Sequence, residues 1–139
     1  MRMNGRRVLV TGGASGIGLA TARRFIAEGA RVALLDRDEK GLASASKELG
    51  DKVWTVRTDV TSESEVGAAV KGAADALGGL DGLVNAAGIS IWRNFADLTF
   101  EEWRRILSIN LDGPFLVTHA ALPALKAAGG ATVVNIASG

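Results

Sequence analysis

The stretch Val8–Gly18, which reads Val-Leu-Val-Thr-Gly-Gly-Ala-Ser-Gly-Ile-Gly, decides the fold of this chain. A short apolar run stops at Thr11 and Gly12, and a helical pattern begins after Gly16 and Gly18. A strand that leads through a glycine-rich turn into a helix forms an anion site, because the first backbone N–H groups of a helix have no partner within it and carry partial positive charge. The alternative is a tight strand-to-helix turn without a ligand, since such motifs also match by chance.

Composition restricts the class of protein. The 139 residues suit one domain, and 47% apolar with 22% charged residues can build a buried core. A net charge of +1 gives no electrostatic reason to expect nucleic acid or an anionic membrane as partner. The chain has no cysteine and one histidine, His119, so we expect no metal site. No apolar run approaches the roughly 20 residues of a membrane span, and the basic start lacks the apolar segment of a signal peptide, so we expect a cytoplasmic protein.

Strands and helices are predicted to alternate along the chain. Apolar runs predict strands over residues 7–10, 31–35, 53–58, 83–86 and 131–137. Helical spacing and caps predict helices over residues 15–28, 39–49, 62–77, from 99 onward and, after a new start at 112–114, to 127 with a bend at Pro123. Ser62 with Glu65 and Thr99 with Glu102 match the capping box, in which two side chains satisfy free backbone donors at a helix start.

This alternation predicts an α/β fold, a doubly wound parallel sheet of about five strands with helices on both faces. Right-handed crossovers and a dinucleotide-type turn after the first strand favour the strand order 3-2-1-4-5. The ligand crevice is then expected at the carboxyl ends of the first and fourth strands, where the winding of the sheet reverses.

Asp36 is a candidate for cofactor recognition. It lies 18 residues beyond Gly18 at the end of the second predicted strand, where a dinucleotide-binding fold places the carboxylate that accepts hydrogen bonds from an adenosine ribose. A carboxylate there repels a 2′-phosphate, so we expect NAD rather than NADP. Arg37 weakens this preference, because a neighbouring arginine attracts that phosphate. The alternative is a solvated aspartate after a strand.

With these residues in place, the sequence resembles the short-chain dehydrogenase/reductase family. Five segments carry the resemblance, in the family's order and over the whole chain. They are the Thr-Gly-x-x-x-Gly-x-Gly turn at Thr11–Gly18, the adenine-contacting pair Asp59 and Val60, the Asn-Ala-Ala-Gly segment Asn85–Gly88, Asn110, and Asn135–Ser138. In Asn85–Gly88, alanine takes the second place of the family's Asn-Asn-Ala-Gly motif.

The resemblance implies a role for each segment. Pyrophosphate would lie against Thr11, Gly12, Ser15, Gly16, Ile17 and Gly18. The adenosine half would lie beside Asp36, Arg37, Asp59 and Val60. The fourth strand would be steadied, and the ribose bordered, by Asn85, Ala86, Ala87 and Gly88. Ser138 would hydrogen-bond a small alcohol or carbonyl substrate, and Asn110 would help to organise a proton relay. Alternatively, Asn110 only bridges a helix junction, since buried polar groups need partners regardless of function, and Ser138 is a frayed terminus.

The sequence departs from the family at its catalytic base. The family's general acid/base is a tyrosine in a Tyr-x-x-x-Lys motif that follows the position of Ser138, but this chain has no tyrosine. Lys126 precedes the fifth predicted strand and so cannot be the motif's lysine. We therefore expect residues 1–139 to form a single NAD(P)-binding Rossmann domain, incomplete at its C-terminus and inactive by itself.

Two hypotheses describe the function. In the first, the chain is the dinucleotide-binding portion of an NAD-dependent alcohol/ketone oxidoreductase. In the second, it is a non-catalytic folding or interaction fragment that needs a partner chain. The apolar helix residues Phe115, Leu116, Leu122 and Leu125 and an unprotected edge strand favour a homo-oligomer or a complementing C-terminal fragment.

Overall fold

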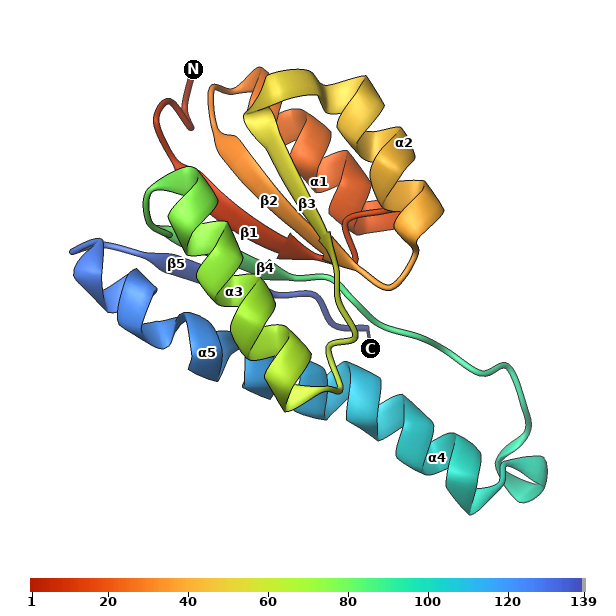
Figure 1. The fold of residues 1–139 in the computed structure, drawn as a ribbon. Helices are drawn as coiled ribbons and strands as arrows, with labels where there is room; N and C mark the ends of the chain where they lie inside the picture. The colour runs from red at the N-terminus through yellow and green to blue at the C-terminus, as the bar shows by residue number, and fades with distance from the viewer. Residues whose placement is uncertain (139) are drawn as a thin grey trace.

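The five predicted strands form one parallel sheet (Figure 1). The computed structural model describes residues 1–138. The strand order β3-β2-β1-β4-β5 confirms the predicted order. The strands are β1 (Arg7–Thr11), β2 (Arg31–Asp36), β3 (Val53–Arg57), β4 (Gly82–Asn85) and β5 (Thr132–Asn135). The predicted bounds are wrong by one or two residues for most strands, and the fifth strand is shorter than the predicted 131–137.

The helices connect these strands in the predicted alternation. They are α1 (Gly16–Ala27), α2 (Glu39–Leu49), α3 (Glu63–Leu77), α4 (Phe100–Leu107) and α5 (Gly113–Ala127). Two short 3-10 turns, Gly50–Lys52 and Phe95–Asp97, precede β3 and α4. Each connection contains a helix, as crossovers between parallel strands usually do. Within the described residues, none of the helices is long and apolar enough to cross a membrane.

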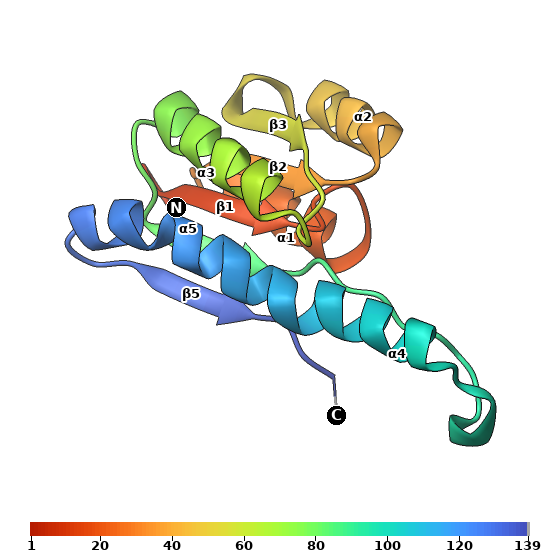
Figure 2. The same cartoon turned by 60° about the horizontal axis from the view of Figure 1, so that its bottom comes forward.

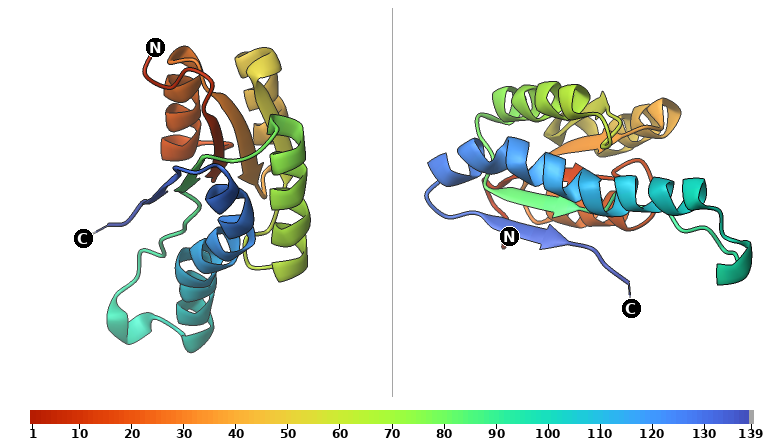
Figure 3. Two further views of the ribbon diagram at one scale, coloured as in Figure 1. Left: turned by 90° about the vertical axis from the view of Figure 1, so that its left-hand side faces the viewer. Right: turned by 90° about the horizontal axis from the view of Figure 1, so that it is seen from below.

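Alternate residues of the inner strands face opposite sides of the sheet, and each side has its own core. On one side, Leu9, Leu35 and Leu83 pack with residues of α3 and α5. On the other side, Val10 and Leu34 pack with residues of α1 and α2. The two helical layers are separated by the sheet in Figure 3. Strands buried on both faces explain the nearly continuous apolar runs in the sequence.

Two predicted helix features need correction. The sequence predicts a new helix start at Asp112–Pro114, but α4 continues through a π-helical segment, Ser108–Asp112, directly into α5. The predicted capping box at α3 is only half formed. Ser62 accepts a hydrogen bond from the Glu65 N–H, whereas the Glu65 carboxylate binds Arg57 at 3.0 Å. The box at α4 is complete as predicted, and the bend at Pro123 stays a prediction.

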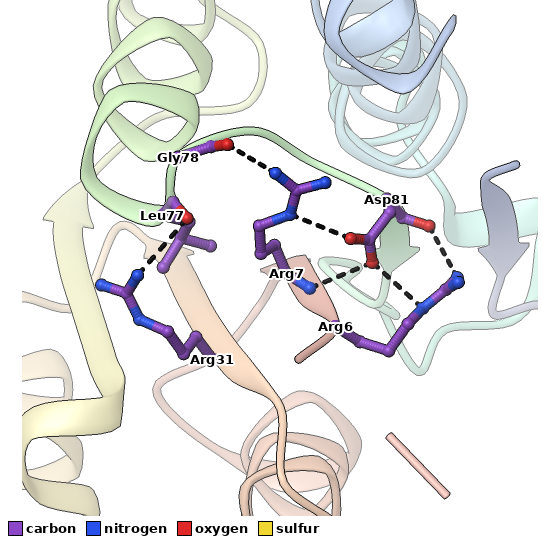
Figure 4. Close-up of polar contacts among 6 residues, drawn as sticks. All are labelled: Arg6, Arg7, Arg31, Leu77, Gly78 and Asp81. Atoms are coloured by element: carbon purple, nitrogen blue, oxygen red, sulfur yellow. Dashed lines mark hydrogen bonds and ion pairs between the residues drawn. The ribbon is translucent and has the colours of Figure 1, made fainter. Parts of the chain in front are cut away.

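An ionic cluster ties the amino ends of the central strands together (Figure 4). The buried Asp81 carboxylate contacts Arg6 Nε and Arg7 Nε at 3.0 Å each, and also accepts a bond from the Arg7 N–H. The Asp81 carbonyl accepts bonds from the Arg6 side chain and from the Thr132 N–H of β5. One residue therefore links β1, β4 and β5 at the end of the sheet opposite to the predicted crevice.

Residues 89–107, which we call the arm, project beyond the carboxyl end of the sheet (Figure 2). The arm consists of an irregular segment, the turn Phe95–Asp97 and helix α4. Its tip is held by the capping box of Thr99 and Glu102 and by an ion pair between Arg93 and Glu102 at 2.8 Å.

Candidate functional site

A crevice of 360 Å³ lies at the carboxyl ends of β1 and β4, where the sequence predicts the ligand site. Its walls come from the glycine turn, the end of β2, the loop after β3 and the segment after β4. Eleven of the predicted cofactor residues line it, namely Gly12, Ser15, Gly16, Ile17, Gly18, Asp36, Arg37, Val60, Ala86, Ala87 and Gly88. Three others, Thr11, Asp59 and Asn85, lie outside its walls.

The glycines of the turn serve different purposes. A Cβ at Gly18 would overlap the Gly12 carbonyl oxygen, so only glycine lets α1 approach the turn this closely. A Cβ at Gly12 would lie 2.8 Å from the Ala87 backbone nitrogen. Gly16 has a φ of +53°, which glycine adopts readily, and its missing side chain would point into open space at the crevice. The first two positions shape the turn, whereas Gly16 keeps the crevice open.

The amino end of α1 is left without a side-chain cap. Ser15 precedes the helix but makes no capping hydrogen bond, and no acidic residue lies in the first turn. By contrast, α2, α3 and α4 are capped by Asp38, Ser62 and Thr99, respectively. The free N–H groups and the helix dipole of α1 therefore face the crevice unneutralised, as an anion-binding helix end requires.

Asp36 joins the end of β2 to the glycine turn. One carboxylate oxygen, Oδ2, accepts a hydrogen bond from the Ala14 N–H at 3.0 Å, and the other accepts one from the Asp38 N–H at 2.9 Å. Each oxygen keeps a further lone pair for a ligand hydroxyl. Arg37 is exposed beside it at the rim of the crevice. The two residues lie where the sequence predicts them.

Thr11 lies under the crevice and connects β1 to the segment after β4. Its buried hydroxyl oxygen accepts hydrogen bonds from the Ala86 and Ala87 N–H groups at 3.2 and 3.1 Å. The side chain is therefore fully used within the protein, and its effect on a ligand is exerted through the position of Ala86 and Ala87. No pattern in the sequence indicates this link.

Val60 lines the crevice, whereas Asp59 is not among its lining residues. The Asp59 carboxylate accepts bonds from the Thr61 hydroxyl at 2.7 Å and from the Thr61 N–H at 2.9 Å. The Thr61 hydroxyl, followed by the Thr61 N–H, holds the pKa of Asp59 below its ordinary value of 3.8. Asp59 thus stays ionised and fixes the turn after β3, which places Val60 in the wall.

Asn85 is buried and ties β4 to its neighbours. Its Nδ2 donates to the Thr118 hydroxyl at 3.1 Å and to Asn135 Oδ1 at 2.8 Å, which links β4 to α5 and β5. Among the described residues, Asn85 Oδ1 has no hydrogen-bond partner although it is buried. The Asn85 side chain therefore ties β4 to α5 and β5, and its role beside a cofactor stays a prediction.

Neither candidate catalytic residue is among those that line the crevice. Asn110 Oδ1 accepts from the Ile89 N–H at 2.9 Å, and Asn110 Nδ2 donates to the Ile89 carbonyl at 2.8 Å. The Asn110 side chain thus ties the π-helical segment to the base of the arm, and its part in a proton relay stays a prediction. Ser138 is exposed and, like Asn110, does not line the crevice.

Sequence reasoning missed part of the wall. Leu35, Thr58 and Ile109 line the crevice together with Ile89. Leu35 and Thr58 lie at or just beyond the carboxyl ends of β2 and β3, and that position is the only signal that could have identified them. Residues 1–138 contain no group of three or more His, Asp or Glu side chains placed to hold a metal ion.

The parallel sheet, the glycine turn and the crevice at the reversal of winding define a Rossmann-like fold, the type that binds nicotinamide dinucleotides. The family model described as short chain dehydrogenase matches residues 6–139. The chain belongs to this family.

The similar proteins are longer than this chain. A 3-alpha-(or 20-beta)-hydroxysteroid dehydrogenase of Mycobacterium tuberculosis is 44% identical over 138 residues, which are 99% of this chain and 53% of the relative. An NADP-dependent (R)-specific alcohol dehydrogenase of Lentilactobacillus kefiri is 37% identical, with 99% and 56% covered. The crystal structure of a 3-ketoacyl-(acyl-carrier-protein) reductase from Brucella melitensis complexed with NADH superimposes with a TM-score of 0.92 at 35% identity, covering 98% and 58%. The chain spans about half the length of the curated relatives it matches.

Proposed function

We propose that this chain is the dinucleotide-binding portion of an NAD-dependent short-chain oxidoreductase that acts on an alcohol or ketone. The observation that carries the proposal is the uncapped amino end of α1, which opens onto a crevice kept clear at Gly16. A pyrophosphate supplies the negative charge that the side chains of the first turn do not provide. The residues present therefore fit a dinucleotide.

The preference for NAD rests on Asp36. Its two oxygens are fixed by the Ala14 and Asp38 N–H groups, so the carboxylate is held in place to accept bonds from ribose hydroxyls. A 2′-phosphate at the same position would meet a fixed negative charge. Similar proteins differ in the dinucleotide named with them, since they include an NADP-dependent alcohol dehydrogenase and a reductase complexed with NADH.

The bound cofactor would carry the hydride, while the protein supplies position and electrostatics. Within this chain, α1 holds the phosphates, Asp36 orients the adenosine ribose, and Thr11 and Asn110 fix the segment from Ala86 to Ile89 along the crevice. Ser138 is the residue we assign to a substrate oxygen. The chain has no tyrosine, so the proton donor of the family's mechanism is missing and the chain is inactive alone.

The exposed surfaces favour association. Val133 and Val134 of β5 and Ile136, which directly follows it, are each more than 40% exposed, and β5 has no strand on its outer side within residues 1–138. Phe115 and Leu122 are exposed on α5. We infer that these surfaces are covered by a second copy or by a complementing C-terminal fragment. A non-catalytic fragment that needs such a partner is the competing function.

Calorimetric titration with NAD separates the two functions. Saturable binding, weakened in Asp36→Ala, supports the dinucleotide-binding portion, whereas no binding by a chain that is folded by circular dichroism supports the non-catalytic fragment. An assay with NAD and secondary alcohols tests the expected inactivity. Turnover that survives rigorous purification would show that the chain has a proton donor other than the family's tyrosine.

Light scattering over a concentration series tests association, and a constant monomer mass would contradict it.

A further inference from the structure

The residues before β1 form a segment that lies against the carboxyl end of α1, away from the crevice. This segment, residues 2–6, which we call the strap, contains the only asparagine of the sequence that is followed by glycine, Asn4 before Gly5. Asn4 is exposed. Gly5 has a φ of +74°, and a Cβ there would meet nothing within 4 Å. The pair is therefore open to water, and no side chain hinders a reaction at the Gly5 nitrogen.

An asparagine that precedes glycine can become an acid without an enzyme, and asparagine is among the thermolabile residues of proteins. The backbone nitrogen of Gly5 gives up its proton to water and forms a bond to Asn4 Cγ, while the side-chain nitrogen leaves as ammonia. The product is a five-membered succinimide ring. Water then adds to either of its two carbonyl carbons and opens the ring, which gives aspartate or isoaspartate. One water is consumed and one ammonia is released, and no oxidant or reductant takes part.

The folded strap holds the attacking nitrogen in a hydrogen bond. The Gly5 N–H donates to the Gly29 carbonyl at 3.2 Å, and the Met3 N–H donates to the Glu28 carbonyl at 3.0 Å. The left view of Figure 3 shows the start of the chain at this end of α1. While it is bonded to Gly29, the Gly5 nitrogen keeps the proton that it must lose. The ring can therefore close only when the strap lifts from α1, which is a local opening of the fold.

The Glu28 side chain anchors the strap. Its Oε2 accepts a hydrogen bond from the Arg2 N–H at 3.0 Å, and its Oε1 contacts the Arg2 guanidinium at 3.5 Å and pairs with Arg24. The Arg2 N–H, followed by the charges of Arg24 and Arg2, holds the pKa of Glu28 below its ordinary value of 4.5, although partial desolvation opposes this. The carboxylate is thus ionised at neutral pH and accepts charge-assisted hydrogen bonds.

We propose that Asn4 is a site of spontaneous deamidation and that Glu28 sets its rate by holding the strap against α1. Either product adds one negative charge to the strap. Isoaspartate also adds a methylene group to the main chain between residues 4 and 5, so the Met3 and Gly5 N–H groups no longer match the spacing of their two carbonyl acceptors. The modified strap is therefore detached more of the time than the unmodified one. The inference does not depend on cofactor binding.

Incubation of the full chain in mildly alkaline buffer tests the site. Digestion and mass spectrometry at successive times follow the change from amide to acid in the peptide that contains residue 4, and chromatography separates aspartate from isoaspartate. We expect steady conversion in the parent and none in Asn4→Gln, whose longer side chain closes a six-membered ring far more slowly. If the folded parent shows no conversion over a time in which the same chain converts in urea, Asn4 is not a modification site of the native protein.

Two variants test the anchor. Glu28→Gln keeps the size of the side chain but loses its charge, so the bonds to the strap weaken and we expect conversion about threefold faster or more. Arg2→Gln weakens the same anchor from an exposed residue of the strap, so it acts in the same direction without altering α1. The matched control, Glu48→Gln, breaks the exposed pair with Arg23 and leaves the strap's contacts in place, so its rate equals that of the parent.

Hydrogen exchange of the Gly5 amide measures the opening of the strap directly. The exchange rate should rise in Glu28→Gln and Arg2→Gln but not in Glu48→Gln, and circular dichroism compares the fold of each variant with that of the parent. The anchoring role is overturned if both strap variants convert at the parent's rate. It is also overturned if Glu48→Gln accelerates conversion as much as they do, since a general loosening of α1 would then set the rate.

Discussion

The Asp36 carboxylate accepts a hydrogen bond from the Ala14 N–H at 3.0 Å, across the gap between the end of β2 and the glycine turn. The residue proposed to recognise the ribose therefore also holds the turn that is proposed to bind the pyrophosphate. Two parts of the crevice that are 22 residues apart in the sequence are fixed relative to one another by this one side chain.

This relationship predicts different effects for two substitutions of Asp36. Asp36→Ala removes the acceptor for Ala14 and the charge, so NAD binding weakens by about 1.5–3 kcal/mol and discrimination against NADP relaxes. Asp36→Asn keeps an oxygen for the Ala14 N–H, so it retains the melting temperature of the parent better than Asp36→Ala does. Titrations with both dinucleotides and thermal unfolding check this. NAD binding unchanged in Asp36→Ala would show that Asp36 is only a surface charge.

The glycines predict a contrast between binding and folding. At Gly16 a side chain meets open space, so Gly16→Val costs only the roughly 1–2 kcal/mol of the unfavourable φ but blocks the approach of the pyrophosphate. At Gly18 the new Cβ overlaps the Gly12 carbonyl oxygen, so Gly18→Ala disturbs the turn itself. Circular dichroism and NAD titration on the same samples distinguish the two. Equal loss of fold and binding in Gly16→Val would favour a turn without a ligand.

Features that depend on local patterns can be predicted from the sequence. Apolar runs and the glycine turn predict the strand order, and the motif at Thr99 predicts a capping box that forms. The same motif at Ser62 fails in part, because the sequence does not show that Arg57 lies close enough to take the Glu65 carboxylate. Likewise, a Gly-Pro pair suggests a helix start, but a π-helical segment carries the chain straight on into α5.

Long-range side-chain contacts cannot be predicted in this way. Asn110 shares a motif position with catalytic residues, yet its amide is occupied by Ile89, 21 residues away. Thr11 reaches residues 75 and 76 positions further along the chain. The Asp81 cluster has no motif at all, since it depends on three strands meeting at one end of the sheet.

Thr11 offers a test of the link between β1 and the segment after β4. Thr11→Val keeps the shape but leaves the Ala86 and Ala87 N–H groups without an acceptor, so we expect a loss of about 1–3 kcal/mol in the free energy of unfolding. Thr11→Ser keeps the hydroxyl and retains most of the stability. Urea unfolding measures both. Equal stability of the two variants would mean that water replaces the hydroxyl.

Asp81 is predicted to matter for β5 as well as for overall stability. Asp81→Ala leaves Arg6 and Arg7 without their carboxylate, and because both arginines are about one third exposed, the loss should be about 1–3 kcal/mol rather than the larger cost of a fully buried pair. The hydrogen-exchange rates of the β5 amides should rise in the same variant. Lys71→Ala, which breaks an exposed ion pair on α3, serves as the control. If the β5 amides exchange at the same rate in Asp81→Ala as in the parent, the Asp81 cluster does not stabilise the edge strand.

Acid should loosen the arm through Glu102. The Thr99 N–H, followed by the charge of Arg93, holds the pKa of Glu102 below its ordinary value of 4.5, although partial desolvation opposes this. Because the folded state favours the ionised form, the contribution of Glu102 is complete above pH 4.5 and is lost as the pH falls through its lowered pKa. The Thr99 amide should then exchange faster. Hydrogen exchange against pH measures this change, and Glu102→Gln, which cannot ionise, should remove the part of it that comes from this carboxyl. If the exchange rate of the Thr99 amide depends on pH equally in the parent and in Glu102→Gln, other carboxylates cause the change.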